Sequence, residues 1–215
     1  MNDSKLTYNE VEAILESTIP SRAEVMFDEQ RQSLSYRDQD GIEYTLVLPL
    51  VLPSIAQADV AGILQQLRRA TRTYTIILVQ AGAAALGYYE NGDIAHHKVI
   101  KKYMVRQKQG KSQLNHLKSK GKSRLGSRIR LKNSIAFFEE INETLTVWNV
   151  AAKSETLLMA LPISLKSLFY TANVPPPFEK RDPRIKKVPL DIRIPNFKEL
   201  EHVNWVVSRG ELRRS

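Results

Sequence analysis

The chain of 215 residues contains no cysteine at all. This absence excludes a disulfide framework, a thiolate metal site and a cysteine nucleophile. Long hydrophobic runs are also missing, because Pro49 interrupts residues 46–52 and two glycines fall within residues 81–89. Neither run reaches the roughly 20 apolar residues that a membrane span needs. The first ten residues are polar and resemble no secretory signal, so we expect a cytoplasmic protein with no membrane partner.

Acidic residues are absent from one long stretch, residues 101–132, which contains twelve lysines and arginines. The whole chain has a formal net charge of +9, so positive charge is concentrated here and the remainder is slightly acidic. Such a block repels itself unless a polyanion neutralises it, and this favours nucleic acid as the partner. The alternative is a solvated basic loop without a specific partner.

Several familiar catalytic sites are missing as well. The runs Gly110-Lys111-Ser112 and Gly121-Lys122-Ser123 imitate the end of a phosphate-binding loop, but the upstream glycine that such a loop requires is absent from both. His96 and His97 are adjacent in an expected strand, where neighbouring side chains point to opposite faces and do not readily share one ion. We therefore expect neither a metal nor a cofactor.

Periodicity and turn residues predict an alternation of helices and strands. The expected helices cover residues 5–17 with Ser4 as N-cap, 57–69, about 128–150, 164–171, and a last segment that begins at Asn196. The expected strands cover residues 22–28, 31–37, 42–48, 74–79, 84–89, 93–102, 155–160 and about 185–192. Asp40-Gly41 and Asn91-Gly92 are hairpin turn signals. Residues 107–126 have no apolar period and are expected to form a long loop.

Three consecutive strands followed by alternating helices and strands predict an α/β fold, with a mixed β-sheet flanked by helices. We expect a small N-terminal α+β extension at residues 1–72, a central domain at 73–207 and a C-terminal tail at 208–215. Trp148, Trp205 and the pair Phe137-Phe138 are interpreted as packing residues, because they lie on helices with apolar periodicity.

Gln113, in the basic loop, is a candidate for hydrolytic chemistry. A glutamine has no useful pKa, but its amide can orient a water molecule for attack on a reactive ester. Gly110 permits backbone geometry that other residues avoid, which suits the tip of a loop. A glutamine in a polar loop is more often a solvated side chain, so this signal alone is weak.

The run from Lys102 to Gln113, followed by Gly121, Ser127, Arg130 and a long helix, resembles the peptidyl-tRNA hydrolases of ribosome-associated quality control. These are the release-factor-like domain of the eukaryotic ankyrin-repeat and zinc-finger hydrolase and its bacterial relatives, in the superfamily of the middle domain of eukaryotic and archaeal class-1 release factors. A second stretch, from Ser167 to Leu200, resembles the closing helix, strand and helix of the same domain. The two stretches follow one another in the order found in the family. The resemblance covers roughly residues 73–207.

The resemblance implies a ribonuclease-H-like release-factor middle domain with a long basic catalytic loop that enters the peptidyl transferase centre. Gln113 would position water against the ester of peptidyl-tRNA, and Gly110 and Ser112 would shape the tip. Class-1 release factors carry Gly-Gly-Gln, whereas Lys111-Ser112 precede the glutamine here. The residues expected to hold ribosomal RNA and tRNA are Lys101, Lys102, Arg106, Lys108, Lys111, Lys118, Lys120, Lys122, Arg124, Arg128 and Arg130.

Three functions follow from these observations. The first is a codon-independent rescue factor that hydrolyses peptidyl-tRNA on stalled large ribosomal subunits, because we expect no room for both a codon-reading domain and a third release-factor domain. The second is a non-catalytic factor of the same fold that binds ribosomal RNA. The third is a metal-dependent nuclease, which the missing carboxylate cluster in the basic loop disfavours. The sequence leaves the oligomeric state open, and we expect a monomer.

Overall fold

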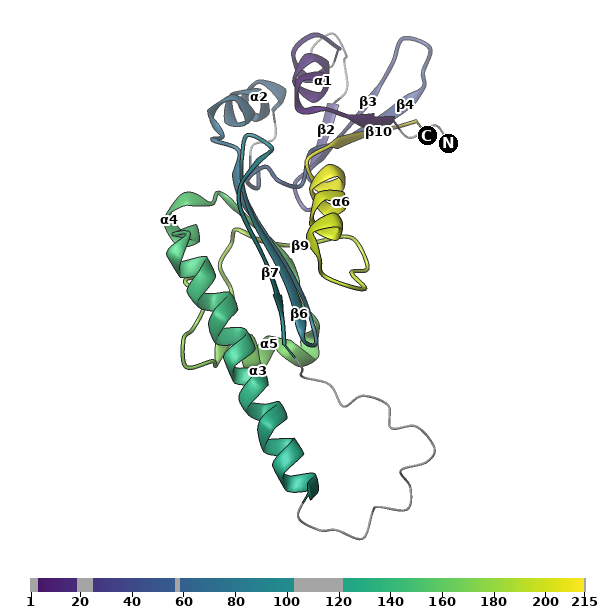
Figure 1. Cartoon of the computed structure of the whole chain (residues 1–215). Coiled ribbons are helices and arrows are strands. Elements are labelled where there is room, and N and C mark those ends of the chain that lie inside the picture. The colour runs from purple at the N-terminus through teal and green to yellow at the C-terminus, as the bar shows by residue number, and fades with distance from the viewer. Residues whose placement is uncertain (1–3, 19–24, 57–58, 103–121, 215) are drawn as a thin grey trace, which may run out of the picture.

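The computed structural model describes residues 4–18, 25–56, 59–102 and 122–214, and for residues 122–133 it describes the backbone alone. Two five-stranded sheets and the helices packed on them form this part of the chain (Figure 1). The strands are β1 (Ser4–Leu6), β2 (Val25–Asp28), β3 (Ser33–Arg37), β4 (Glu43–Val47), β5 (Thr73–Gln80), β6 (Ala83–Glu90), β7 (Asp93–Lys101), β8 (Thr156–Ala160), β9 (Ile185–Lys187) and β10 (Gly210–Arg214). The helices are α1 (Tyr8–Ala13) with the π-helical turn η1 (Ile14–Thr18), α2 (Val60–Arg69), α3 (Lys122–Val147), α4 (Val150–Lys153), α5 (Ile163–Tyr170) and α6 (Phe197–Val207). The predicted α/β class is confirmed.

The first sheet combines the two ends of the described chain. Its order is β1-β10-β4-β3-β2, and every neighbouring pair is antiparallel. The sequence predicts a tail over 208–215, but β10 lies there and pairs with β1 on one side and β4 on the other. The sequence did not indicate this strand because Leu212 is the one apolar residue of the segment Gly-Glu-Leu-Arg-Arg.

Helix α1 starts later than the sequence predicts. Ser4 belongs to strand β1, and Thr7 is the N-cap. The side chain of Thr7 accepts a hydrogen bond from the Glu10 backbone N–H, and the Glu10 carboxylate accepts one from the Thr7 backbone N–H at 2.7 Å. This reciprocal capping box satisfies two of the N–H groups that a helix start leaves without partners.

The two predicted hairpin turns are confirmed. Asn91 and Gly92 have φ values of 54° and 94°, the left-handed pair that a tight turn between twisted strands requires. Gly41 has φ 77°, and the Asp38 carboxylate accepts hydrogen bonds from the N–H groups of Asp40 and Ile42. These turns set the register of β3 with β4 and of β6 with β7.

The second sheet has the order β7-β6-β5-β8-β9. Strands β5, β6 and β7 are antiparallel neighbours, whereas β8 and β9 run parallel to β5. Strand β5 is buried on both faces: Ile77 and Val79 pack with residues of α3, and Ile76 and Leu78 pack with residues of α6. The two helices therefore cover opposite faces of the sheet (Figure 1).

Helix α3 is longer at its start than the sequence predicts. It begins at Lys122, so the last five residues of the expected loop 107–126 are helical. Lysine, arginine and leucine favour helix there and outweigh Gly126. Phe137 and Phe138 are fully buried, as predicted. Trp205 is different, because 47% of it is exposed and its ring stacks on the Arg209 guanidinium.

Candidate nucleic-acid interface

The loop residues that the sequence singles out lie mostly outside the described part of the chain. This applies to Gly110, Ser112 and Gln113, and to the basic residues Arg106, Lys108, Lys111, Lys118 and Lys120. Lys122, Arg124, Arg128 and Arg130 fall on the first turns of α3, where the backbone alone is described. The structure therefore defines the two roots from which the loop leaves, the end of β7 and the start of α3.

The end of β7 lies at the edge of the second sheet where four strands finish. Gln80 at the end of β5 pairs with Ala83, and Ala83 pairs with Lys101 at the end of β7. On the other side of β5, Leu78 pairs with Ala160 at the end of β8, and Met159 pairs with Lys187 at the end of β9. We call this the carboxyl edge, and it brings the loop root together with the ends of the parallel strands. Ligands in open α/β sheets usually bind outside the carboxyl ends of such strands.

Lys101 and Lys102, at the loop root, differ in their surroundings. The Lys101 side chain is exposed. The Lys102 ammonium lies 2.9 Å from the Glu140 carboxylate and donates a hydrogen bond to the Ala136 carbonyl, so it is bound to helix α3. Lys98 lies 3.1 Å from the other oxygen of Glu140. Hydrogen bonds from Lys102 and Lys98 hold the pKa of Glu140 below its usual value.

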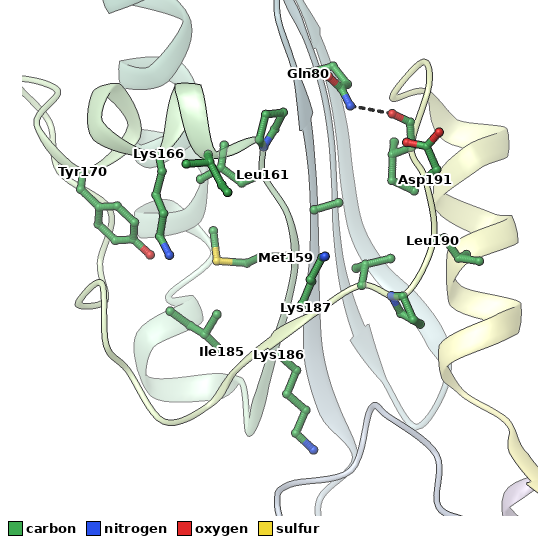
Figure 2. Close-up of a pocket in the computed structure, with 16 residues that line it drawn as sticks. Gln80, Met159, Leu161, Lys166, Tyr170, Ile185, Lys186, Lys187, Leu190 and Asp191 are labelled. Carbon is green, nitrogen blue, oxygen red and sulfur yellow. Dashed lines mark hydrogen bonds between the residues drawn. The ribbon is translucent and has the colours of Figure 1, made fainter. Parts of the chain in front are cut away.

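A cavity of about 1020 Å³ opens at the carboxyl edge between β8, α5 and the segment after β9 (Figure 2). Lys166, Lys187 and Tyr170 line it together with apolar side chains such as Met159 and Leu161. Sequence reasoning missed this site. The signals that point to it are the Leu161-Pro162 pair that ends a buried strand and the Lys186-Lys187 pair in a short one.

The two adjacent histidines point to opposite faces of β7, as predicted. The His96 ring stacks 5.7 Å from Trp148, which follows α3, and the His97 ring lies 4.6 Å from Phe197 of α6. Within residues 4–18, 25–56, 59–102 and 134–214, histidines and carboxylates form no group of three suited to a metal ion.

No helix in the described part of the chain is long and apolar enough to cross a membrane.

Asp182 and Arg184, in the second stretch of the resemblance, form a structural turn into β9. The Arg184 guanidinium donates to both carboxylate oxygens of Asp182, at 3.0 and 2.7 Å, and to the carbonyls of Ala151 and Ser154. The hydrogen bonds between the two side chains lower the pKa of Asp182 and raise that of Arg184. The turn thereby ties the start of β9 to the segment that precedes β8.

Curated relatives of this chain come from animals. Residues of the chain are 30% identical over 136 positions to the tRNA endonuclease ANKZF1 of Mus musculus, covering 61% of this chain and 18% of that protein. The human protein of the same name is 29% identical over 146 residues, with 66% and 20% covered. The tRNA endonuclease vms-1 of Caenorhabditis elegans is 29% identical over 129 residues, with 58% and 20% covered. The chain thus spans about a fifth of the length of these relatives.

A solved structure has the same fold. The Vms1 mitochondrial localization core superposes with a TM-score of 0.54 at 15% identity, and the match covers 94% of this chain and 80% of the other. Residues 74–214 match the family model described as the Bacteroidetes VLRF1 release factor. This match includes β5 to β10 and both loop roots. The chain therefore belongs to the Bacteroidetes VLRF1 release factor family.

Proposed function

We propose that this protein is a ribosome-rescue enzyme of the cytoplasm that releases the nascent chain from peptidyl-tRNA by hydrolysis at the tRNA acceptor end. Membership of a release factor family, over residues 74–214, is the observation that carries this proposal. The names of the curated relatives, which are tRNA endonucleases, support tRNA as the substrate class. The protein acts as a monomer on the large ribosomal subunit and reads no codon.

The bond proposed for cleavage is the ester between the peptide and the terminal adenosine of tRNA. Gln113 orients the attacking water through its amide, which needs no change of protonation state. Gly110 and Ser112 shape the loop tip so that this amide reaches the ester. The sheet order β7-β6-β5-β8-β9, with three antiparallel strands and two parallel ones, supports the ribonuclease-H-like domain that the resemblance implies.

The basic residues hold the loop on RNA. Lysine and arginine neutralise phosphates and release counterions, so this contact is largely independent of base sequence. Lys101, Arg106, Lys108, Lys111, Lys118, Lys120, Lys122, Arg124, Arg128 and Arg130 are proposed for that role. Lys102 is proposed for a structural role instead, because its bonds to Glu140 and Ala136 fix the loop root on α3.

A second candidate is cleavage of a phosphodiester bond in the acceptor strand. The names of the three relatives favour it, since an endonuclease that cuts the acceptor strand leaves nucleotides on the peptide. Both reactions place the same acceptor end against the same loop. They differ in the product, and the product is directly measurable.

Single-turnover cleavage on purified stalled large subunits tests the proposal. The peptidyl-tRNA carries one label on the peptide and another at the 5′ end of the tRNA. Ester hydrolysis yields full-length tRNA and a peptide with a free carboxyl group. Endonucleolytic cleavage yields shortened tRNA and a peptide that retains nucleotides.

Two variants of the loop sharpen this experiment. We expect Gln113→Ala to bind the subunit normally and to release peptide at least a hundredfold more slowly, whereas the matched Gln107→Ala variant keeps wild-type activity. If wild-type protein binds and releases nothing, the protein is a non-catalytic ribosome-binding factor and the proposed function is wrong. If release persists in Gln113→Ala, the proposed hydrolase activity is supported and the proposed role of Gln113 is wrong.

A further inference from the structure

The cavity at the carboxyl edge is built from chain segments that meet beyond the ends of β8 and β9. Its walls are the end of β8, the first residues of α5 and the segment that follows β9 (Figure 2). The loop root at Lys101 finishes at the same edge, with strands β6 and β5 between β7 and β8. A ligand in this cavity therefore lies on the side of the molecule from which the loop leaves.

Positive charge faces the cavity without neutralising partners. Lys166 and Lys187 line it, and within the described residues neither side chain has an ion pair or hydrogen bond to protein. Lys186 is different, because its ammonium donates to the Leu52 carbonyl at 2.6 Å and points away from the centre of the cavity (Figure 2). Two ammonium groups that line one cavity favour an anionic ligand.

Two further donors lie on the same side. Helix α5 begins at Ile163 after Pro162, with no side chain capping its first N–H groups, and helix starts attract anions. The Tyr170 hydroxyl is buried and has no hydrogen-bond partner in the described residues. Burial raises the pKa of Tyr170, so the hydroxyl keeps its proton and can donate it to a ligand oxygen. A buried hydroxyl without a partner is costly unless a ligand or water supplies one.

The remaining lining is mostly apolar, with one exposed acidic group and the Gln80 amide, which donates to the Ile192 carbonyl. Met159, Leu161 and Ile185 offer a surface on which a flat ring can pack. Asp191 lies on the opposite side of the cavity from Lys166 (Figure 2). A carboxylate accepts hydrogen bonds from the amino groups of cytosine and adenine. A ligand with a phosphate, a flat ring and an amino group matches all these features, and an acidic peptide matches the lysines alone.

We propose that this cavity binds one nucleotide of the single-stranded acceptor end of tRNA, with its phosphate on Lys166 and Lys187 and its base against Met159 and Ile185. This inference rests on the proposed function, since it names a binding subsite for the same substrate. The subsite holds the acceptor strand at the same end of the sheet as the loop root, while the loop carries the reacting end. Positioning of this kind raises reaction rates by converting encounters into intramolecular contacts.

Equilibrium binding of a short single-stranded RNA oligonucleotide that ends in CCA provides the test. We expect the Lys166→Gln/Lys187→Gln double variant to bind about tenfold more weakly, and the slope of log K against log salt to fall by about 0.7, as the loss of one neutralised phosphate predicts. Lys153→Gln is the matched control, because this exposed lysine lies in α4 at the opposite end of β5 and β8. It should change neither the affinity nor the slope.

A chemical label gives a second readout that does not depend on folding of a variant. Periodate converts the 3′-terminal ribose of the same oligonucleotide without its last adenosine, the residue that the loop would take, to a dialdehyde. The dialdehyde forms an imine with a nearby lysine, and borohydride fixes the product. Mass spectrometry of the wild-type chain should find Lys166 or Lys187 labelled well above Lys153. Equal labelling of all exposed lysines would overturn the proposal.

The outcomes separate this inference from the proposed function. If wild-type protein cleaves peptidyl-tRNA and the double variant binds the oligonucleotide as tightly as wild type does, the proposed subsite is wrong and the proposed cleavage activity is supported. If cleavage is absent and binding still depends on Lys166 and Lys187, the RNA subsite stands and the proposed reaction is wrong. If a hexaglutamate peptide displaces the oligonucleotide at equal concentration, the cavity is a general anion site and the nucleotide assignment fails.

Discussion

Lys102 and Glu140 join the end of strand β7 to the middle of helix α3 through an ion pair of 2.9 Å. The Lys102 ammonium also donates to the Ala136 carbonyl, one turn earlier on α3. Lys98 reaches the same carboxylate from the β7 position four residues before. Glu140 thus holds two cations against the helix, Lys98 of β7 and Lys102 directly after it, and this fixes the root at the end of β7.

Replacing Glu140 should loosen this root with a small effect on stability. The pair is about one third exposed, and ion pairs of that kind contribute about 1 kcal/mol or less. We expect Glu140→Gln to lower the free energy of unfolding by no more than that at pH 7. Urea denaturation measures the change, and Glu143→Gln, an exposed position on the same helix, is the matched control.

The pH dependence of this pair has a definite sign. The pKa of Glu140 is lowered in the folded protein, so its contribution is present above the usual pKa of 4.5 and is lost as the pH falls through the folded value. The difference in stability between wild type and Glu140→Gln should therefore shrink below pH 4.5. A difference that stays constant between pH 7 and pH 3.5 would contradict the ion pair.

Local signals predicted much of the second sheet. The turn residues Asn91 and Gly92 placed the hairpin of β6 and β7, and Asn196 marked the start of α6, where its side chain accepts a hydrogen bond from the Glu199 N–H at 2.8 Å. These features depend on neighbours in the sequence, so a single chain reveals them. The resemblance to release factors is confirmed by the family match.

Long-range pairing escaped prediction. Strand β10 is held by partners more than 150 positions away in β1 and β4, and its own residues carry no alternation. The cavity of Lys166 and Lys187 was missed for a related reason, because α5 and β9 meet there only once the sheet is assembled. The role of Gln113 stays a prediction, since that residue lies outside the described part of the chain.

Gly210 should be intolerant of any side chain. A Cβ atom built there would lie 2.5 Å from a methyl carbon of Val11 and 3.0 Å from the Val47 carbonyl oxygen. We expect Gly210→Ala to destabilise the protein by about 1–3 kcal/mol, because β10 must move away from α1 and β4. Thermal unfolding measures this loss. If Gly210→Ala unfolds at the wild-type temperature, the packing of β10 against α1 is wrong.

Arg184 should not be replaceable by lysine. Its planar guanidinium donates to Asp182 and to two backbone carbonyls, a geometry that a single ammonium group does not reproduce. We expect Arg184→Lys to lower the free energy of unfolding by about 1–2 kcal/mol, since a carbonyl loses its partner. The neighbouring exposed Arg181→Lys change is the control and should be neutral. Equal stability of the two variants would contradict the assigned role of the turn.

Lys186 gives a stability change at alkaline pH. Burial lowers its pKa from 10.5 to about 8, although its ammonium donates to the Leu52 carbonyl. Between pH 8 and pH 10.5 the unfolded chain binds more protons at this residue than the folded protein does. The free energy of unfolding therefore gains a contribution that rises with pH across this window, by at most about 3 kcal/mol.

The variant Lys186→Met should lack that contribution. Other groups also titrate in this window, so the informative quantity is the difference between wild type and variant, measured by urea denaturation at pH 7 and pH 10. We expect wild type to gain stability relative to Lys186→Met as the pH rises. Lys187→Met, which changes the adjacent exposed lysine of β9, should follow wild type at both pH values. Parallel behaviour of all three proteins would mean that the Lys186 ammonium is not buried against Leu52.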